Sequence, residues 1–183
     1  MAGDGEETIV LAGGCFWCVE AVFQAVRGVS DVASGYAGGT AETANYRDVC
    51  TGATNHAEVV RVRFDPRLVS LEQLLDIFFR VAHDPTQVDR QGADIGRQYR
   101  SAIFYRDDDQ RRIAEEIIRR LDESGAFKQS IATRLEPLEG FFPAEEYHRD
   151  YAARNPEQPY IACHVPPKLD KLRAGFGETF RSE

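Results

Sequence analysis

The chain has 183 residues, of which 43% are hydrophobic and 28% are charged, and its formal net charge is −8. This length and composition are typical of a soluble globular protein with a real hydrophobic core, and they predict a single domain over residues 1–183. The acidic balance and the absence of a basic stripe exclude nucleic acid and anionic membranes as partners.

The N-terminal residues show no pattern of a targeting segment. The first seven residues are acidic and lack an apolar core, and no run in the chain approaches the length of a membrane span. We therefore expect a cytoplasmic protein, and a monomer. Its ordered core is expected from about residue 7 to 175, with flexible ends at 1–6 and 181–183.

The first predicted elements are a strand, a tight turn and a helix. The apolar run Thr8–Ala12 leads into Gly13 and Gly14, and the helical spacing of apolar residues begins after Cys15 and ends near Gly28. A cysteine at a helix N-terminus lies near unpaired backbone N–H groups and the positive end of the helix dipole, which both favour a thiolate. A buried, inert cysteine is the competing interpretation.

The next part predicts two strands separated by a long loop. Residues 29–39 begin as a strand and end in glycines, and residues 40–55 show no periodicity. From His56 to Phe64 the apolar residues alternate with polar ones, which is typical of a strand with one wet face. Asp65-Pro66 ends this strand.

The second half predicts a further set of helices and strands. Ser70 and Gln73 form a possible capping box for a helix that runs to His83-Asp84-Pro85, after which residues 84–98 form a second long loop. The remaining elements are a strand over 101–105, an amphipathic helix over 107–124, a strand over 131–138, a polar helix over 144–154, an irregular tail and a short helix over 168–174. This order predicts an α+β fold with helices packed on a mixed or antiparallel sheet.

The two long loops carry side chains that can bind or transfer protons. Tyr46 and Glu58 lie in or near the first loop, and Asp94 and Tyr99 lie in or near the second. A Glu58 that faces the apolar side of its strand would be desolvated and would act as a general acid near neutral pH. From the residues alone, the outward orientation is the expected one.

Cys15 and Cys18 form a Cys-x-x-Cys pair. Four cysteines are too few for a disulfide scaffold, so this pair indicates redox chemistry or metal binding, a nucleophile with a resolving partner, or simple packing. A zinc site would need Cys163 and His164 as its second pair of ligands. These two residues are adjacent, whereas paired zinc ligands are usually separated by two to four residues, so no metal is expected. Cys50 is interpreted as a packing residue.

Phe16 and Trp17 follow the candidate nucleophile directly. Adjacent residues on a helix point in different directions, so one of the two rings can face outward. The only tryptophan of the chain beside a reactive thiol suits a small apolar pocket, such as one for a methyl group.

Together, these motifs resemble the A class of peptide methionine sulfoxide reductases. The resemblance covers residues 8 to about 175. The matching blocks are Gly13–Trp17, Gly35–Gly39, Tyr46–Gly52, His56–Val60, Asp65-Pro66, His83–Pro85, Gly92–Ser101, Tyr147–Tyr151 and Asn155-Pro156.

The resemblance implies a two-layer α/β sandwich with a ferredoxin-like core, and it implies a role for each matching residue. Cys15 corresponds to the nucleophile that attacks the sulfoxide sulfur, and Glu58 to the proton donor for the oxygen. Phe16 and Trp17 correspond to the pocket for the substrate methyl group. Tyr46, Asp94 and Tyr99 correspond to groups that help bind the oxygen or a catalytic water.

The implied reaction repairs oxidative damage by reducing methionine S-sulfoxide, free or in proteins. The sulfoxide oxygen is a poor leaving group, so a neutral carboxylic acid must protonate it as the thiolate attacks. Cys15 then becomes a sulfenic acid, which condenses with a second thiol. Thioredoxin, with NADPH and thioredoxin reductase, is the expected external reductant of the disulfide, and no bound cofactor is expected.

The chain departs from the family pattern at Asn55, where a glycine is usual, and at Cys18. Cys18 and Cys163 are both candidates for the resolving cysteine. If Cys15 and Cys18 are both helical, a direct disulfide distorts the first turn, whereas Cys163 lies on a proline-rich tail that can swing over the site. Cys163 is therefore the favoured candidate.

Two other functions remain open on the sequence. A general thiol–disulfide oxidoreductase would use Cys15 and Cys18 without needing Glu58 or an aromatic pocket. A zinc-stabilised interaction module is the second alternative.

Overall fold

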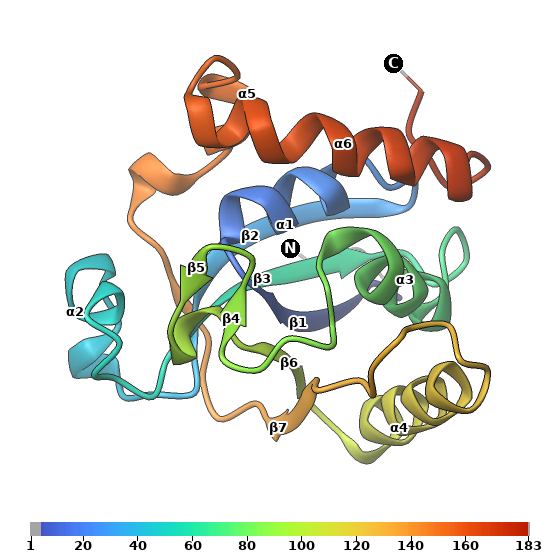
Figure 1. The fold of residues 1–183 in the computed structure, drawn as a ribbon, viewed down its shortest axis with the longest axis horizontal. Helices are drawn as coiled ribbons and strands as arrows, with labels where there is room; N and C mark the ends of the chain where they lie inside the picture. The colour runs from blue at the N-terminus through green and yellow to red at the C-terminus, as the bar shows by residue number, and fades with distance from the viewer. Residues whose placement is uncertain (1–4, 183) are drawn as a thin grey trace.

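The computed structural model describes residues 5–182. Its main feature is one six-stranded sheet with the strand order β7-β6-β1-β3-β2-β8 (Figure 1). A separate two-stranded hairpin pairs β4 with β5. The strands are β1 (Glu7–Gly13), β2 (Val29–Ala37), β3 (Ala57–Phe64), β4 (Arg90–Gln91), β5 (Asp94–Ile95), β6 (Ser101–Tyr105), β7 (Arg134–Pro137) and β8 (Phe142–Pro143).

The four central strands have the ferredoxin-like arrangement. In the order β6-β1-β3-β2, each strand is antiparallel to its neighbours, so the β1-α1-β2 and β3-α3-β6 units interleave. β7 pairs with β6 in parallel and makes the sheet mixed. The predicted α+β fold with a mixed sheet is confirmed.

The helices differ greatly in length. They are α1 (Phe16–Gln24), α2 (Tyr46–Cys50), α3 (Leu71–Ile77), α4 (Asp108–Glu123), α5 (Tyr151–Arg154) and α6 (Pro159–Gly175). Ser70 and Gln73 cap α3 with the predicted reciprocal hydrogen bonds, and α3 continues into a π-type turn, η2 (Phe78–Ala82). Both long loops contain short elements, which are α2 and the turn η1 (Ala41–Thr43) in the first, and the β4–β5 hairpin and η3 (Arg97–Tyr99) in the second.

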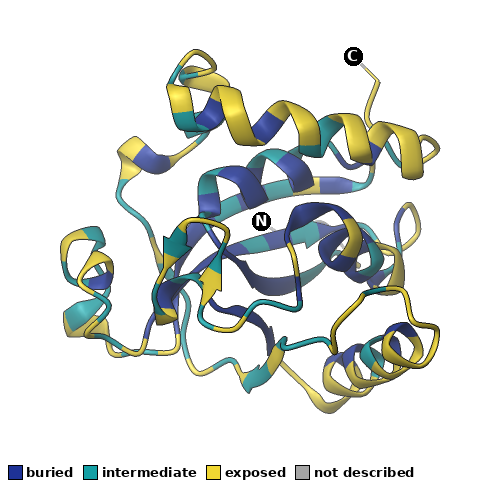
Figure 2. Ribbon diagram, viewed as in Figure 1, coloured by how far each residue is buried: buried dark blue, intermediate teal, exposed yellow. Residues whose placement is uncertain are grey.

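The sheet separates two apolar clusters. In Figure 2 the buried residues gather on the central strands and on the helices next to them. On one face, side chains such as Leu11 and Val62 pack against α1, α3 and α4. On the other face, the smaller cluster around Val59 is covered by Leu138 and Phe141, from the chain that follows β7. Each fully buried large apolar side chain stabilises the fold by about 1.5–3 kcal/mol.

The C-terminal region forms a regular helix, and the expected irregular tail is wrong. α6 runs through Pro166 and Pro167, although each interior proline lacks an N–H and disfavours a helix. Ile161, Val165 and Leu172 are buried at helical spacing on the side of α6 that meets α1, and this burial offsets the cost of the prolines.

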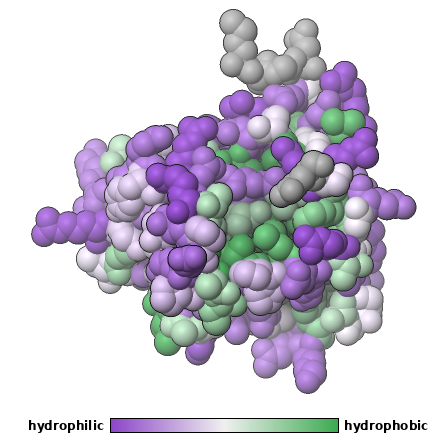
Figure 3. Space-filling view, turned by 90° about the horizontal axis from the view of Figure 1, so that it is seen from above, coloured by the Kyte–Doolittle hydropathy of each residue, from purple (hydrophilic) through white to green (hydrophobic). Residues whose placement is uncertain are grey.

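α6 packs over α1 as an outer layer but leaves part of the surface of α1 uncovered. A shallow apolar groove of about 300 Å³ runs between α1, α5 and α6. Figure 3 looks onto this side of the molecule and shows hydrophobic surface between hydrophilic side chains.

Two other expectations differ from the structure. The polar helix expected over 144–154 is replaced by a turn, η4 (Glu146–His148), and by the short α5, because Asp150 has a left-handed backbone that interrupts a helix. Arg181 is anchored, since its backbone N–H donates to the Ala25 carbonyl over 2.8 Å. The flexible ends expected at 1–4 and 183 lie outside the described residues. Over the described part of the chain, no helix is long and apolar enough to cross a membrane.

Candidate active site

Cys15 lies where the chain turns from β1 into α1. Gly14 makes this turn with φ 88°, a left-handed conformation that favours glycine. A Cβ at Gly14 would come within 2.7 Å of the Gln91 Cβ on the β4–β5 hairpin. The turn therefore needs a glycine both for its backbone and for the close approach of the hairpin to Cys15.

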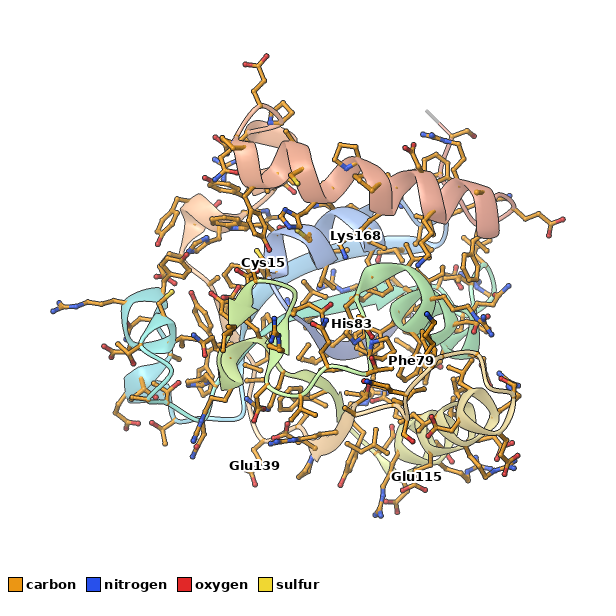
Figure 4. All side chains as sticks on the ribbon, in the orientation of Figure 1. Cys15, Phe79, His83, Glu115, Glu139 and Lys168 are labelled. Carbon is orange, nitrogen blue, oxygen red and sulfur yellow. The ribbon has the colours of Figure 1, made fainter. Side chains whose placement is uncertain are left out.

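Cys15 is the N-cap residue of α1, outside the helical conformation, and its side chain is half-buried. Figure 4 shows it at the start of α1, with Lys168 reaching down from α6. The predicted position of the cysteine at the helix N-terminus is confirmed, and the residue keeps part of its surface exposed.

Glu58 lies beside this turn and is buried, with 2% of its surface exposed. Its carboxyl oxygen Oε1 accepts a hydrogen bond from the backbone N–H of Phe16 over 3.2 Å. The expected outward orientation is wrong, because Glu58 shares the strand parity of Val60 and Val62 and so faces α1. Burial, with smaller contributions from Asp94 and Cys18, raises the pKa of Glu58 to about 8. The carboxyl group is consequently neutral near pH 7.

The thiols of Cys15 and Cys18 form a hydrogen-bonded pair. The hydrogen bond from Cys15 lowers the pKa of Cys18, and the nearby ammonium of Lys168 adds to this effect. The same bond, burial and the charge of Glu58 raise the pKa of Cys15. The expected preference for a resting thiolate at Cys15 is therefore wrong, because these three effects outweigh that of the helix N-terminus. The two thiols therefore lose their protons as a pair, in which the shared hydrogen bond and Lys168 favour the thiolate of Cys18.

A Cys15–Cys18 disulfide does not need a distorted helix. Because Cys15 is the N-cap and Cys18 is the third residue of α1, only Cys18 has a helical backbone. Distortion of the first turn was expected only if both cysteines were helical, and this condition does not hold because Cys15 lies outside the helix.

Cys163 is not part of this cluster. It lies in α6 and is exposed, whereas Ile161 and Val165 on either side of it are buried against α1. Its thiol therefore points away from Cys15, and a regular helix replaces the flexible tail on which the preference for Cys163 depended. The choice of resolving cysteine stays a prediction.

The three loop residues expected near the thiol lie around it. Tyr46 begins α2 and Tyr99 ends η3, and the charges of Glu58 and Cys15 raise the pKa of both phenols, in addition to the larger effect of burial. Asp94 lies in β5, opposite Gln91, and accepts a hydrogen bond from the Tyr160 hydroxyl over 2.5 Å.

Phe16 and Trp17 take different environments, as expected for adjacent aromatic residues. Phe16 is fully buried and Trp17 is partly exposed. The Trp17 ring stacks on Tyr151 with a centroid distance of 3.9 Å, and its indole N–H donates to His148 Nδ1 over 3.0 Å. The ring centroids of Tyr46 and His148 lie 4.5 Å apart, so Tyr46 of α2 belongs to the same group of aromatic rings as Trp17 and Tyr151.

Several residues of the site were missed from the sequence. His148 and Tyr151 belong to the Tyr147–Tyr151 block, which matched the family but received no role. Tyr160 and Lys168 lie beside Cys18, and no local pattern marks them. The family block was the available signal for the first two.

Cys50 was expected to be a packing residue, and this is wrong. It is exposed at the end of α2, and its thiol bonds to the hydroxyl of Tyr46. His56 lies in the loop just before β3, where its Nδ1 accepts from Gly39 N–H and its Nε2 bonds to the Thr40 carbonyl. Among residues 5–182, no group of three or more histidine, cysteine or acidic side chains is placed to hold a metal ion.

Comparisons with known proteins agree with the motifs. A family model described as peptide methionine sulfoxide reductase matches residues 7–179. The chain is 51% identical to peptide methionine sulfoxide reductase MsrA 2 from Synechocystis, over 98% of this chain and 84% of the relative.

Solved structures show the same likeness. The crystal structure of Mxr1 from Saccharomyces cerevisiae in reduced form has a TM-score of 0.79 and 36% identity, covering 84% of this chain and 88% of Mxr1. Mxr1 in complex with Trx2 has a TM-score of 0.57 and 26% identity, covering 81% of this chain and 86% of that one.

Proposed function

Because the chain belongs to the peptide methionine sulfoxide reductase family, we propose that it reduces the S epimer of methionine sulfoxide, free and in proteins, back to methionine. Its family makes it an oxidoreductase. Repair of oxidised proteins in the cytoplasm is the proposed role.

One observation carries this proposal. A buried carboxyl group with a pKa of about 8, that of Glu58, lies at the start of the helix whose N-cap is the half-buried Cys15. A neutral acid beside a thiol is what the reduction of a sulfoxide requires, because the oxygen leaves only as it gains protons. Simple disulfide exchange needs no such acid.

In the proposed reaction, the sulfur of Cys15 attacks the sulfoxide sulfur while its own proton passes to Cys18. Glu58 gives its proton to the sulfoxide oxygen. This attack forms a bond between the two sulfurs. The protonated oxygen then passes to the sulfur of Cys15 as its bond to the substrate sulfur breaks. The bond between the two sulfurs breaks in the same step, which releases methionine and leaves Cys15 as a sulfenic acid. The substrate sulfur is reduced and Cys15 is oxidised, so electrons and atoms balance.

The surrounding side chains fit the two ends of the sulfoxide. The partly exposed Trp17 offers apolar surface for the methyl group, with the buried Phe16 as the adjoining apolar side chain of α1. Tyr46 and Tyr99 bring hydroxyls to the side of Glu58. Because burial and nearby acids raise the pKa of both phenols, they stay protonated and able to donate to the oxygen.

Cys18 is the proposed first resolving thiol. Its sulfur attacks the sulfenic acid of Cys15, which forms a disulfide and releases water. The existing hydrogen bond between the two thiols supports this choice, since the attack needs little movement. Cys163 could take part only in a later exchange of the disulfide, and only if α6 moves.

Thioredoxin is the proposed reductant. The Mxr1–Trx2 complex supports this assignment, because that relative binds such a partner. The dithiol of thioredoxin reduces the disulfide by exchange and is itself recycled through NADPH and thioredoxin reductase. The proposed chemistry requires no bound cofactor.

The test is NADPH consumption with thioredoxin, thioredoxin reductase and each epimer of a methionine sulfoxide substrate. We expect steady turnover with the S epimer, at most trace turnover with the R epimer, and none for Cys15→Ser. Absence of turnover with the S epimer, when dithiothreitol also fails as reductant, contradicts the proposal.

A further inference from the structure

The Tyr147–Tyr151 block takes no part in the chemistry proposed above, yet it is held closely to α1. Trp17, Glu20 and Gln24 are three and four residues apart, so their side chains project from one face of α1. Each of them bonds to a residue of this block. Figure 1 shows the segment before α5 passing beside the N-terminal end of α1.

The first contact holds the indole ring of Trp17 by a hydrogen bond at its edge and by stacking on one of its faces. Its indole N–H donates to His148 Nδ1, and its ring stacks on Tyr151 with an angle of 10° between the planes. Burial lowers the pKa of His148, which keeps the imidazole neutral and able to accept this bond. The orientation of Trp17 thus depends on where the chain places His148 and Tyr151.

The second contact is the buried carboxyl of Glu20, with 1% of its surface exposed. Its Oε1 accepts from the backbone N–H of Asp150 over 3.1 Å, and its Oε2 accepts from the Ser34 hydroxyl over 3.1 Å. A buried acid costs free energy unless it is hydrogen-bonded, and every partner of Glu20 is a donor. The reaction makes no use of this group, so its burial needs another reason.

The third contact is made by the side chain of Asp150, whose backbone N–H bonds to Glu20. Gln24 Nε2 donates to Asp150 Oδ1 over 2.6 Å. Asp150 has a left-handed backbone with φ 52°, a conformation that costs a residue with a side chain about 1 kcal/mol. This turn lies between His148 and Tyr151, so its conformation decides whether both side chains reach Trp17 together.

From these contacts we propose that Glu20 is a positioning residue. By bonding to the N–H of Asp150 it holds the left-handed turn, and the turn keeps His148 and Tyr151 against Trp17. Glu20 touches no reacting atom, and it acts on the reaction only through the orientation of Trp17. The inference rests on the proposed role of Trp17 in binding the substrate methyl group.

The test uses the fluorescence of Trp17, the only tryptophan of the chain, together with steady-state kinetics of the full-length protein. Glu20→Ala removes the acceptor for Asp150. We expect its emission to move to longer wavelength and its KM for methionine sulfoxide to rise about tenfold, with a kcat change below about threefold. Loss of packing alone would lower the melting temperature without this split.

Two variants serve as controls. Glu20→Gln keeps a carbonyl that accepts from Asp150 and gains an amide that donates to the Ser34 hydroxyl, so wild-type emission and KM are expected. Glu157→Ala removes an exposed carboxylate from the same C-terminal segment and should change neither quantity. Should Glu20→Ala fail to fold, Gln24→Ala replaces it, with the same shifts expected at smaller size.

Unchanged Trp17 emission in the folded variant overturns the inference, as does a lower melting temperature with unchanged KM. These outcomes are independent of the proposed function. If the wild-type protein fails to reduce the sulfoxide, the proposed function fails, while the emission of the Glu20 variants still decides whether this residue holds Trp17.

Discussion

The backbone N–H of Phe16 donates a hydrogen bond to the carboxyl of Glu58 over 3.2 Å, although the two residues are 42 positions apart in the chain. This bond ties the first helical residue after the nucleophile to the acid on β3. Burial of the acid outweighs the opposing effect of this bond and raises the pKa of Glu58 to about 8, so its neutral form persists at neutral pH.

Replacing the acid while keeping its shape tests its role. Glu58→Gln retains a carbonyl that accepts from Phe16 but has no proton to give, so kcat should fall by about 10²- to 10⁴-fold. Stopped-flow or single-turnover assays with a methionine sulfoxide peptide measure this loss. A general thiol–disulfide oxidoreductase would keep full disulfide-exchange turnover in the same variant, and retained sulfoxide turnover would contradict the assignment.

The pH dependence of activity follows from the same group. The reaction needs protonated Glu58, whose pKa burial raises to about 8, so kcat should fall as pH rises through this value. A pH profile of kcat between pH 6 and 10, as a chosen experimental range, measures the descending limb. A flat profile up to pH 10 contradicts the role of Glu58 as acid.

The stability of the fold should also depend on pH through the raised pKa of Glu58. The pKa of Glu58 is about 8 in the folded chain and about 4.3 in the unfolded chain, so the folded state binds more protons between these values. Its contribution to stability is fully present below about pH 4.3 and is lost as pH rises through about 8. Melting temperatures of the wild type and Glu58→Gln, compared across this range, should converge or cross at high pH. A constant difference would count against the shift.

The resolving cysteine can be assigned by mapping disulfides after one turnover without reductant. Cys163→Ser should still form the Cys15–Cys18 bond. Cys18→Ser should form the sulfenic acid more slowly, because serine accepts the Cys15 proton poorly, and should then stop at this stage, where dimedone traps it. Rapid formation of a Cys15–Cys163 bond in Cys18→Ser would instead favour the C-terminal cysteine. Cys50→Ser is the matched control, since its exposed thiol bonds to Tyr46 and not to Cys15.

Lys168 offers a test of the thiol pair. Its ammonium lowers the pKa of Cys18, so Lys168→Met should raise that pKa and slow alkylation of Cys18 at neutral pH. The rate of iodoacetamide labelling against pH, in a background without Cys50 and Cys163, measures this change. Lys171→Met on the same helix is the control. Equal labelling rates in the two variants would contradict the electrostatic effect.

The packing of α6 against the core can be tested by truncating one of its buried side chains. Leu172→Ala removes a fully buried side chain from the interface with the core and should lower the free energy of unfolding by about 2–5 kcal/mol. The exposed Arg173→Ala gives a nearby reference, with a change near zero expected. A negligible loss for Leu172→Ala in denaturant titration would mean that the helix contributes little to stability.

Much of the fold follows from local patterns. The alternation of β3, the capping box at Ser70, and the strand–turn–helix around Cys15 each involve neighbours a few residues apart. Backbone sterics and local hydrogen bonds act at this range, so the sequence alone predicts such elements and the family to which the chain belongs. The position of Cys15 at a helix N-terminus was predictable for the same reason.

Tertiary structure decided what depends on distant partners. The inward orientation of Glu58 needs α1 above β3, and the contact of Trp17 with His148 joins residues 131 positions apart. The continuous α6, despite its two prolines, depends on burial against α1. Burial and the pairing of polar groups are properties of the packed chain, because each depends on which remote side chains exclude water from a site. A local pattern cannot contain that information, and the packed structure decides it.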